Sequence, residues 1–165
     1  MTMENDVQGI REQTCFFTGH RDIPRERYVD IQKKLEAAVE VLIEKGVIYY
    51  AVGGAQGFDT IAAMTILKLK AKYSQIRLIM ILPCKNHNFN WQGKDLKVFE
   101  GMKERADKVV YTADRFYNGC MYKRNRQMVD GSGYCICYQS RSTGGTAYTI
   151  NYALSLGVRI YNIAE

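Results

Sequence analysis

The sequence predicts an α/β fold, a three-layer open parallel sheet of about six strands with helices on both faces. Three observations predict it. Short apolar runs alternate along the chain with longer segments whose apolar residues recur every three or four positions. Most of the short runs are continuously apolar, which is typical of strands buried on both faces. A helical segment lies between successive runs, as the crossover between two parallel strands requires.

Six runs have the length of strands and are expected at Thr14–Thr18, Val47–Val52, Arg77–Leu82, Lys108–Tyr111, Tyr134–Tyr138 and Val158–Ile163. The first helix is predicted after Pro24, from an apolar stripe that runs from Tyr28 to Leu42 and ends near Gly46. The other four helices are expected around 58–69, 96–105, 121–129 and 147–154. The third strand should end at Pro83.

A length of 165 residues suits one domain. We therefore expect residues 14–165 to form a single α/β domain, preceded by an N-terminal extension over residues 1–13. Strands and helices fill the chain and leave no room for a second domain. The polar stretch 84–93 is expected to form a loop that covers the carboxyl edge of the sheet.

The composition is that of a globular protein, with 47% apolar and 24% charged residues. No apolar run approaches the roughly 20 residues that span a bilayer, so no membrane partner is expected. Five cysteines without a CxxC pair indicate neither a disulfide framework nor a zinc site. Reduced thiols predict a cytoplasmic protein, and neither metal nor cofactor is expected. The net charge of +6 favours anionic partners, although only weakly.

Ligands of open parallel sheets bind at the carboxyl ends of the strands, where three loops of this chain are unusual. Gly19 follows the first strand and lets the backbone approach a ligand, while His20 and Arg21 supply hydrogen-bond donors. The alternative is an ordinary turn with a solvated arginine.

The second loop carries Gly53, Gly54 and Gly57 between a strand and a helix. Glycines at a helix start let the chain wrap around a phosphate or a ribose. The alternative is a tight turn that binds nothing. Asp59 would either cap the helix or accept a hydrogen bond from a ribose hydroxyl.

The third loop contains two hydroxyl side chains before Gly144 and Gly145, followed by Thr146. It favours phosphate binding, with capping of the helix by Ser142 or Thr143 as the alternative. We expect the second and third loops to face each other. The basic cluster 123–126 opens the fourth helix, and at least one of its arginines is a candidate phosphate ligand, with a solvated face as the alternative.

These motifs, in their order and spacing, resemble the SLOG superfamily of DNA-processing protein A and the phosphoribohydrolases. The closest likeness, from Thr18-Gly19-His20-Arg21, Trp91 and the string Arg-Asn-x-x-Met-Val-Asp at 124–130, is to its YpsA-like branch. The resemblance implies a Rossmann-like fold, a homodimer and a site for a nucleotide derivative. The residues that match its motifs are Gly19, His20, Arg21, Gly53, Gly54, Gly57, Asp59, Arg124, Asn125, Thr143, Gly144, Gly145 and Thr146.

The chain departs from the phosphoribohydrolase pattern, because Asn125 stands where those enzymes carry a lysine and no carboxylate follows Gly145. The first hypothesis is therefore binding or sensing of a nucleotide-derived, phosphate-bearing ligand. The second is cleavage of an N-glycosidic bond, with Asp59 and Arg124 as the candidate catalytic residues. The third is binding of single-stranded DNA, as in DNA-processing protein A.

Overall fold

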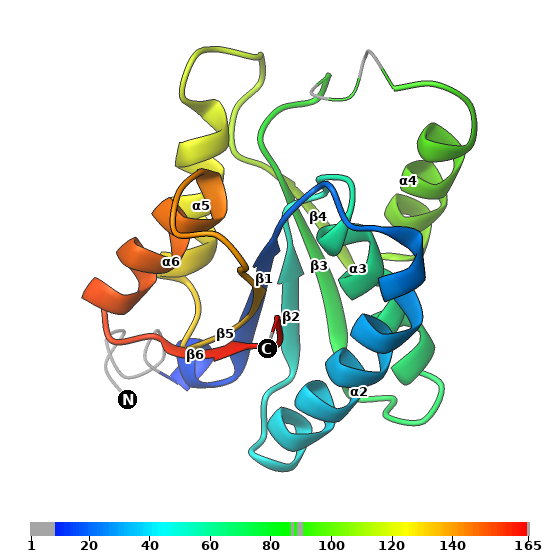
Figure 1. Ribbon diagram of the computed structural model, residues 1–165, viewed down its shortest axis with the longest axis vertical. Helices are drawn as coiled ribbons and strands as arrows, with labels where there is room; N and C mark the ends of the chain where they lie inside the picture. The colour runs from blue at the N-terminus through cyan, green and yellow to red at the C-terminus, as the bar shows by residue number, and fades with distance from the viewer. Residues whose placement is uncertain (1–8, 87, 89–90, 165) are drawn as a thin grey trace.

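Six strands of the described chain form one parallel sheet in the order β4-β3-β2-β1-β5-β6 (Figure 1). The computed structural model describes residues 9–86, 88 and 91–164. The strands are β1 (Thr14–Gly19), β2 (Tyr49–Val52), β3 (Arg77–Leu82), β4 (Lys108–Tyr111), β5 (Tyr134–Tyr138) and β6 (Arg159–Asn162). The predicted fold class is thus confirmed. Residues 1–8 of the predicted N-terminal extension and residues 87, 89 and 90 of the predicted loop 84–93 lie outside the described chain.

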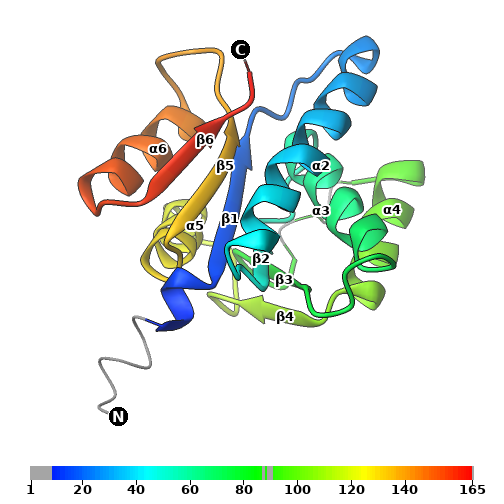
Figure 2. The same cartoon turned by 90° about the horizontal axis from the view of Figure 1, so that it is seen from below.

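The helices cover the two faces of the sheet in two groups, which lie on opposite sides of the strands in Figure 2. One face carries α2 (Tyr28–Glu44), α3 (Phe58–Leu69) and α4 (Gly93–Arg105), and a 3-10 turn, η1 (Arg25–Arg27), leads into α2. The other face carries α5 (Cys120–Asp130) and α6 (Gly145–Ser155). The division follows from the strand order, because right-handed crossovers place helices on opposite faces when the chain reverses its direction across the sheet.

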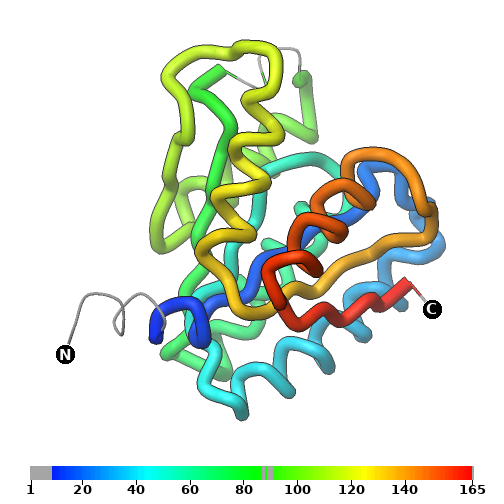
Figure 3. Tube along the Cα trace, turned by 90° about the vertical axis from the view of Figure 1, so that its left-hand side faces the viewer, coloured from blue at the N-terminus to red at the C-terminus, as the bar shows by residue number. Residues whose placement is uncertain are grey.

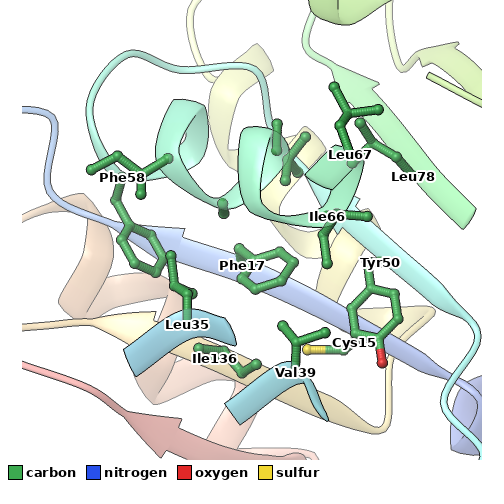
Figure 4. Close-up of a cluster of buried hydrophobic side chains, with 14 of the residues drawn as sticks. Cys15, Phe17, Leu35, Val39, Tyr50, Phe58, Ile66, Leu67, Leu78 and Ile136 are labelled. Atoms are coloured by element: carbon green, nitrogen blue, oxygen red, sulfur yellow. The ribbon is translucent and has the colours of Figure 1, made fainter. Parts of the chain in front are cut away.

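The main core lies between the central strands and the helices α2 and α3 (Figure 4). Leu35 and Val39 stand four residues apart on α2, so both reach the same face and pack over Phe17 of β1. The ring of Phe58, at the start of α3, lies 6.4 Å from that of Phe17 and is fully buried. This packing fixes the start of α3 close to the end of β1.

The second face is only partly covered, because α5 and α6 do not extend over the whole of β2, β3 and β4. Strand β3 therefore alternates, with Leu78 and Met80 buried and Ile79 and Ile81 half-buried. Ile79 and Ile81 border a hollow of about 390 Å³ beside α5. The expectation that a continuously apolar run is buried on both faces is thus wrong for β3.

Candidate functional site

The strand order reverses between β1 and β5, and the loops that follow these two strands open a cleft there. The cleft has a volume of about 670 Å³, within the range of small-molecule sites. Its walls come from the β1 loop, the start of α3, the first turns of α5 and the β5–α6 loop. The topology alone thus creates the gap in which a ligand can sit.

The structure brings most of the predicted site residues to this cleft. Those that line it are Gly19, His20, Arg21, Asp59, Arg124, Asn125, Thr143, Gly144, Gly145 and Thr146. Met121 and Tyr122 of α5 also line it, although the sequence analysis did not select them. Met121 lies three residues before Arg124 and Tyr122 three residues before Asn125 on the same helix, and this spacing is the signal that would have identified them.

The glycines of the second loop, Gly53, Gly54 and Gly57, do not line this cleft. A Cβ atom on Gly54 would lie 2.3 Å from a methyl group of Leu82, and one on Gly57 would lie 2.3 Å from the carbonyl oxygen of Arg21. Gly54 and Gly57 are thus held by close packing of the chain on itself, whereas Gly53 borders a small hollow with Trp91 and Arg124.

The start of α3 is closed by the protein's own atoms. The amide of Phe58 donates to the carbonyl oxygen of His20 at 3.1 Å, and the amide of Ala55 donates to Oδ2 of Asp59 at 3.1 Å. Asp59 therefore stabilises the loop before its own helix through Oδ2. The amide of Phe58 at the start of α3 is thus engaged within the protein, whereas among the described residues no protein acceptor is observed for the amides of Gly145 and Thr146 at the start of α6.

The start of α6 has no such closure. Gly144 precedes it with φ of 99°, and no side chain caps the helix, so the alternative role of Ser142 or Thr143 as a cap is not observed. Among the described residues, no hydrogen bond is observed from the amides of Gly145 and Thr146 to a protein acceptor. Added Cβ atoms on Gly144 and Gly145 would meet open space. These amides are available at the edge of the cleft.

Arg124 forms the floor of the cleft and is only 5% exposed. Its Nη1 donates to the carbonyl oxygen of Gly53, and its Nε donates to Oδ1 of Asn125 at 2.7 Å. Burial lowers the pKa of its guanidinium, while the nearby Asp59 carboxylate opposes that shift. Asn125 thus orients the arginine that the sequence predicted as a phosphate ligand.

Asp59 is buried beside Arg124. Burial raises the pKa of its carboxyl group to about 6, although Arg124 and the amide of Ala55 favour the charged form. The shift indicates that desolvation outweighs the attraction of the arginine.

This shift predicts a pH-dependent stability. Between pH 3.8 and about 6 the folded protein keeps the Asp59 proton while the unfolded chain releases it. The unfolding free energy of the parent should therefore fall, relative to that of Asp59→Asn, by roughly 3 kcal/mol as the pH rises through this window. Urea unfolding of both proteins at pH 4.0 to 7.0 measures the difference, and a constant difference would contradict the assigned shift.

His20 joins the β1 loop to the β5–α6 loop. Its Nε2 accepts a hydrogen bond from the amide of Ser140 at 3.0 Å, so its proton is placed on Nδ1. Burial, followed by the charge of Arg141, lowers its pKa and favours this neutral form. At the exposed rim, Arg141 forms a two-pronged salt bridge to Asp22, with Nη2 3.1 Å from Oδ1. Both contacts hold the two loops together at the mouth of the cleft.

No group of three or more His, Cys, Asp or Glu side chains in the described residues is arranged to hold a metal ion. In the same part of the chain, no helix combines the length and the apolar character needed to cross a membrane. The five cysteines are buried as free thiols.

Solved structures with the same fold include two forms of DNA processing protein A. The protein from Helicobacter pylori superposes with a TM-score of 0.63 at 18% identity, over 94% of this chain and 66% of that chain. The one from Streptococcus pneumoniae superposes with a TM-score of 0.63 at 13% identity, over 95% and 51%. The chain thus spans about two thirds and half of these two proteins, and the likeness shows the fold.

Sequence relatives are UPF0398 proteins. That of Halalkalibacterium halodurans is 29% identical over 126 residues, which cover 74% of this chain and 67% of the relative. That of Bacillus pumilus is 26% identical over 138 residues, which cover 81% and 72%. The model of the YspA SLOG family matches residues 16–161, which include every wall of the cleft. The chain therefore belongs to the YspA SLOG family.

Proposed function

We propose that the cleft binds a nucleotide-derived ligand and holds one of its phosphate groups at the amino end of α6. The observation that carries this proposal is the open start of that helix. The amides of Gly145 and Thr146 border the cleft and have no protein acceptor in the described residues. Unpaired amides and the positive end of the helix dipole together favour phosphate.

The charge of the cleft supports the same ligand class. Three arginines line it, Arg21, Arg124 and Arg141, against the carboxylates of Asp22 and Asp59. Asp22 is engaged by Arg141, and the raised pKa of Asp59 keeps part of its population neutral near pH 6. The balance is positive, which favours an anionic ligand over a neutral nucleoside.

A proline at residue 145 tests the role of the amide. Proline is favoured at the first position of a helix and lacks the N–H group, so Gly145→Pro should keep the fold and lose one donor. A hydrogen bond to a charged group contributes about 1.5–3 kcal/mol, so a nucleoside monophosphate should bind roughly 10- to 150-fold more weakly. Trp91 is the only tryptophan and borders a small hollow with Arg21 and Arg124, so its fluorescence reports the titration.

The matched control is Gly145→Ala, which adds a methyl group to the same residue but keeps the N–H group. It should bind the monophosphate more tightly than the proline variant does. Equal affinities of the two variants, with the fold intact by circular dichroism, would contradict the role of the amide. The panel should also contain inorganic phosphate, the matching nucleoside, ADP-ribose and cyclic nucleotides. A parent that binds none of the phosphate-bearing compounds would overturn the proposal.

DNA processing protein A from Helicobacter pylori binds single-stranded DNA. A nucleic-acid strand would bring the same phosphate chemistry to the cleft of this chain. The panel therefore includes a single-stranded octanucleotide, whose affinity should fall with added salt if its phosphates replace bound counterions.

A second candidate function is cleavage of an N-glycosidic bond, and the observation that favours it is the state of Asp59. Its carboxyl group lines the cleft and has a pKa of about 6, which suits general acid–base catalysis. Incubation with the nucleotide panel and chromatography for free base tests this function. Release of free base by the parent but not by Asp59→Asn would support this cleavage. If the parent releases no base, cleavage is excluded for those substrates.

A further inference from the structure

A second hollow lies beside the cleft, along the length of α5 and beside the first turn of α6, the two helices at the front of Figure 3. Its volume is about 610 Å³, similar to that of the cleft. The side chains that form it are Tyr122, Lys123, Arg126, Gln127, Asp130 and Tyr148. The proposed phosphate site does not explain this surface.

Two tyrosines form one wall of this hollow and are unusually exposed for aromatic side chains. Tyr122 is 50% exposed and Tyr148 is 39% exposed. Their ring centroids are 5.0 Å apart, with an interplanar angle of 73°. This edge-to-face contact fixes the position of both rings and leaves aromatic surface in contact with water. Fixed, exposed rings are the usual platform for a stacked base.

Basic groups flank the two rings. The Nη2 atom of Arg126 donates to the hydroxyl group of Tyr148 at 2.7 Å, and the same guanidinium lies 5.7 Å from the ring centre of Tyr152. Lys123 adds a second positive charge. The carboxylate, Asp130, accepts a hydrogen bond from the hydroxyl group of Tyr152 at 2.7 Å. The hollow thus combines stacking surface with a positive balance, which suits an aromatic ring that carries phosphate.

Tyr122 lines both the hollow and the cleft, so the two spaces meet at this residue. We propose that the hollow binds the second base of a ligand that contains two phosphate-linked nucleotide units, with the first unit in the cleft. The proposal rests on the proposed function, because the cleft must hold the first phosphate. The linkage between the units passes Tyr122 and comes within reach of Lys123 and Arg126.

Stacking of one base on an aromatic side chain corresponds to roughly 5- to 150-fold in affinity. The parent protein should therefore bind a 5′-phosphorylated dinucleotide at least about tenfold more tightly than the matching mononucleotide. Tyr122→Ala should reduce this ratio to near one; because both affinities are measured on the same variant, the ratio discounts any loss of mononucleotide affinity at Tyr122, which also lines the cleft. Tyr122→Phe should preserve the ratio, because the ring remains.

The matched control is Tyr28→Ala, which removes an exposed tyrosine on α2, across the sheet from the hollow. This variant should have the same ratio of dinucleotide to mononucleotide affinity as the parent. Two further ligands identify the source of the second unit, a pyrophosphate-linked dinucleotide and a single-stranded octanucleotide. If the affinity is the same for the dinucleotide and the octanucleotide, the ligand is a free dinucleotide. If the affinity is higher for the octanucleotide, the ligand is a nucleic-acid strand.

Fluorescence titration of Trp91 with these ligands separates the two proposals. The inference is overturned if the parent binds the mononucleotide and the dinucleotide equally well, or if the higher affinity for the dinucleotide survives in a folded Tyr122→Ala protein. Either result leaves the proposed function intact. A parent that binds neither mononucleotide nor dinucleotide overturns both. A parental ratio of at least about ten that is lost only with the aromatic ring supports the inference.

Discussion

Replacing Gly57 by alanine is expected to lower the free energy of unfolding by about 4 kcal/mol. Gly57 has φ of 78° and ψ of −121°, a conformation that residues with a Cβ atom rarely adopt. The new methyl group would also lie 2.3 Å from the carbonyl oxygen of Arg21, which belongs to the backbone. Both effects push the start of α3 away from the β1 loop. Urea denaturation followed by circular dichroism measures the loss.

A glycine in ordinary helical conformation provides the control. Gly101 lies inside α4, and a Cβ atom there would meet open space. Gly101→Ala should raise the unfolding free energy by about 0.5–1 kcal/mol, because alanine restricts the unfolded chain and favours the helix. Similar stabilities of the two variants would show that the contact at Gly57 does not constrain the fold.

Arg124→Met is the second change with a large expected effect, a loss of about 3–5 kcal/mol of unfolding free energy at pH 7.5. The substitution leaves the carbonyl oxygen of Gly53 without its donor and the buried Asp59 carboxylate without the nearest positive charge. It also removes the guanidinium from the floor of the cleft. The thermal stabilisation by a nucleoside monophosphate, about 2.7 kcal/mol at 100 times the dissociation constant, should disappear with it.

Two further variants separate charge from packing. Arg126→Met removes an exposed arginine from the same helix and should change the unfolding free energy by less than about 0.5 kcal/mol. Adding Asp59→Asn to Arg124→Met should recover part of the lost stability, because the unpaired carboxylate is removed. A double variant no more stable than Arg124→Met would contradict electrostatic coupling between Asp59 and Arg124.

The sequence predicted the elements well because buried parallel strands and amphipathic helices differ in their apolar periods. The strands β3, β4 and β5 and the helix α3 have the predicted bounds. Helix α4 begins at Gly93, three residues before the predicted start near Leu96. Its first turn, Gly93-Lys94-Asp95, has no apolar residue, so the periodicity could not reveal it. The sequence also could not predict that only one face of β3 is fully buried, since this depends on how far α5 extends over the sheet.

The candidate site was predicted from the sequence less completely than the fold. A glycine that approaches a ligand and a glycine that approaches its own chain look alike in sequence. Gly144 and Gly145 meet open space, whereas Gly54 and Gly57 would each collide with the protein. The contact between Tyr122 and Tyr148 joins residues 26 positions apart on two helices, and no local pattern predicts it. Arg124 was predicted from its place in a basic cluster, but its burial depends on the fold.

The hollow of about 390 Å³ beside α5 leaves β3 and β4 less covered than the central strands of the sheet. Strands β1 and β5, whose ends open the cleft, are buried along almost their whole length, whereas Ile81 of β3 and Val110 of β4 border the hollow. Local unfolding of β4 should therefore cost less free energy than that of β1, so its amide protons should exchange with solvent faster. A ligand at the β1–β5 junction would then slow exchange in the central strands and leave exchange in β4 almost unchanged, because opening of β4 would be independent of that junction.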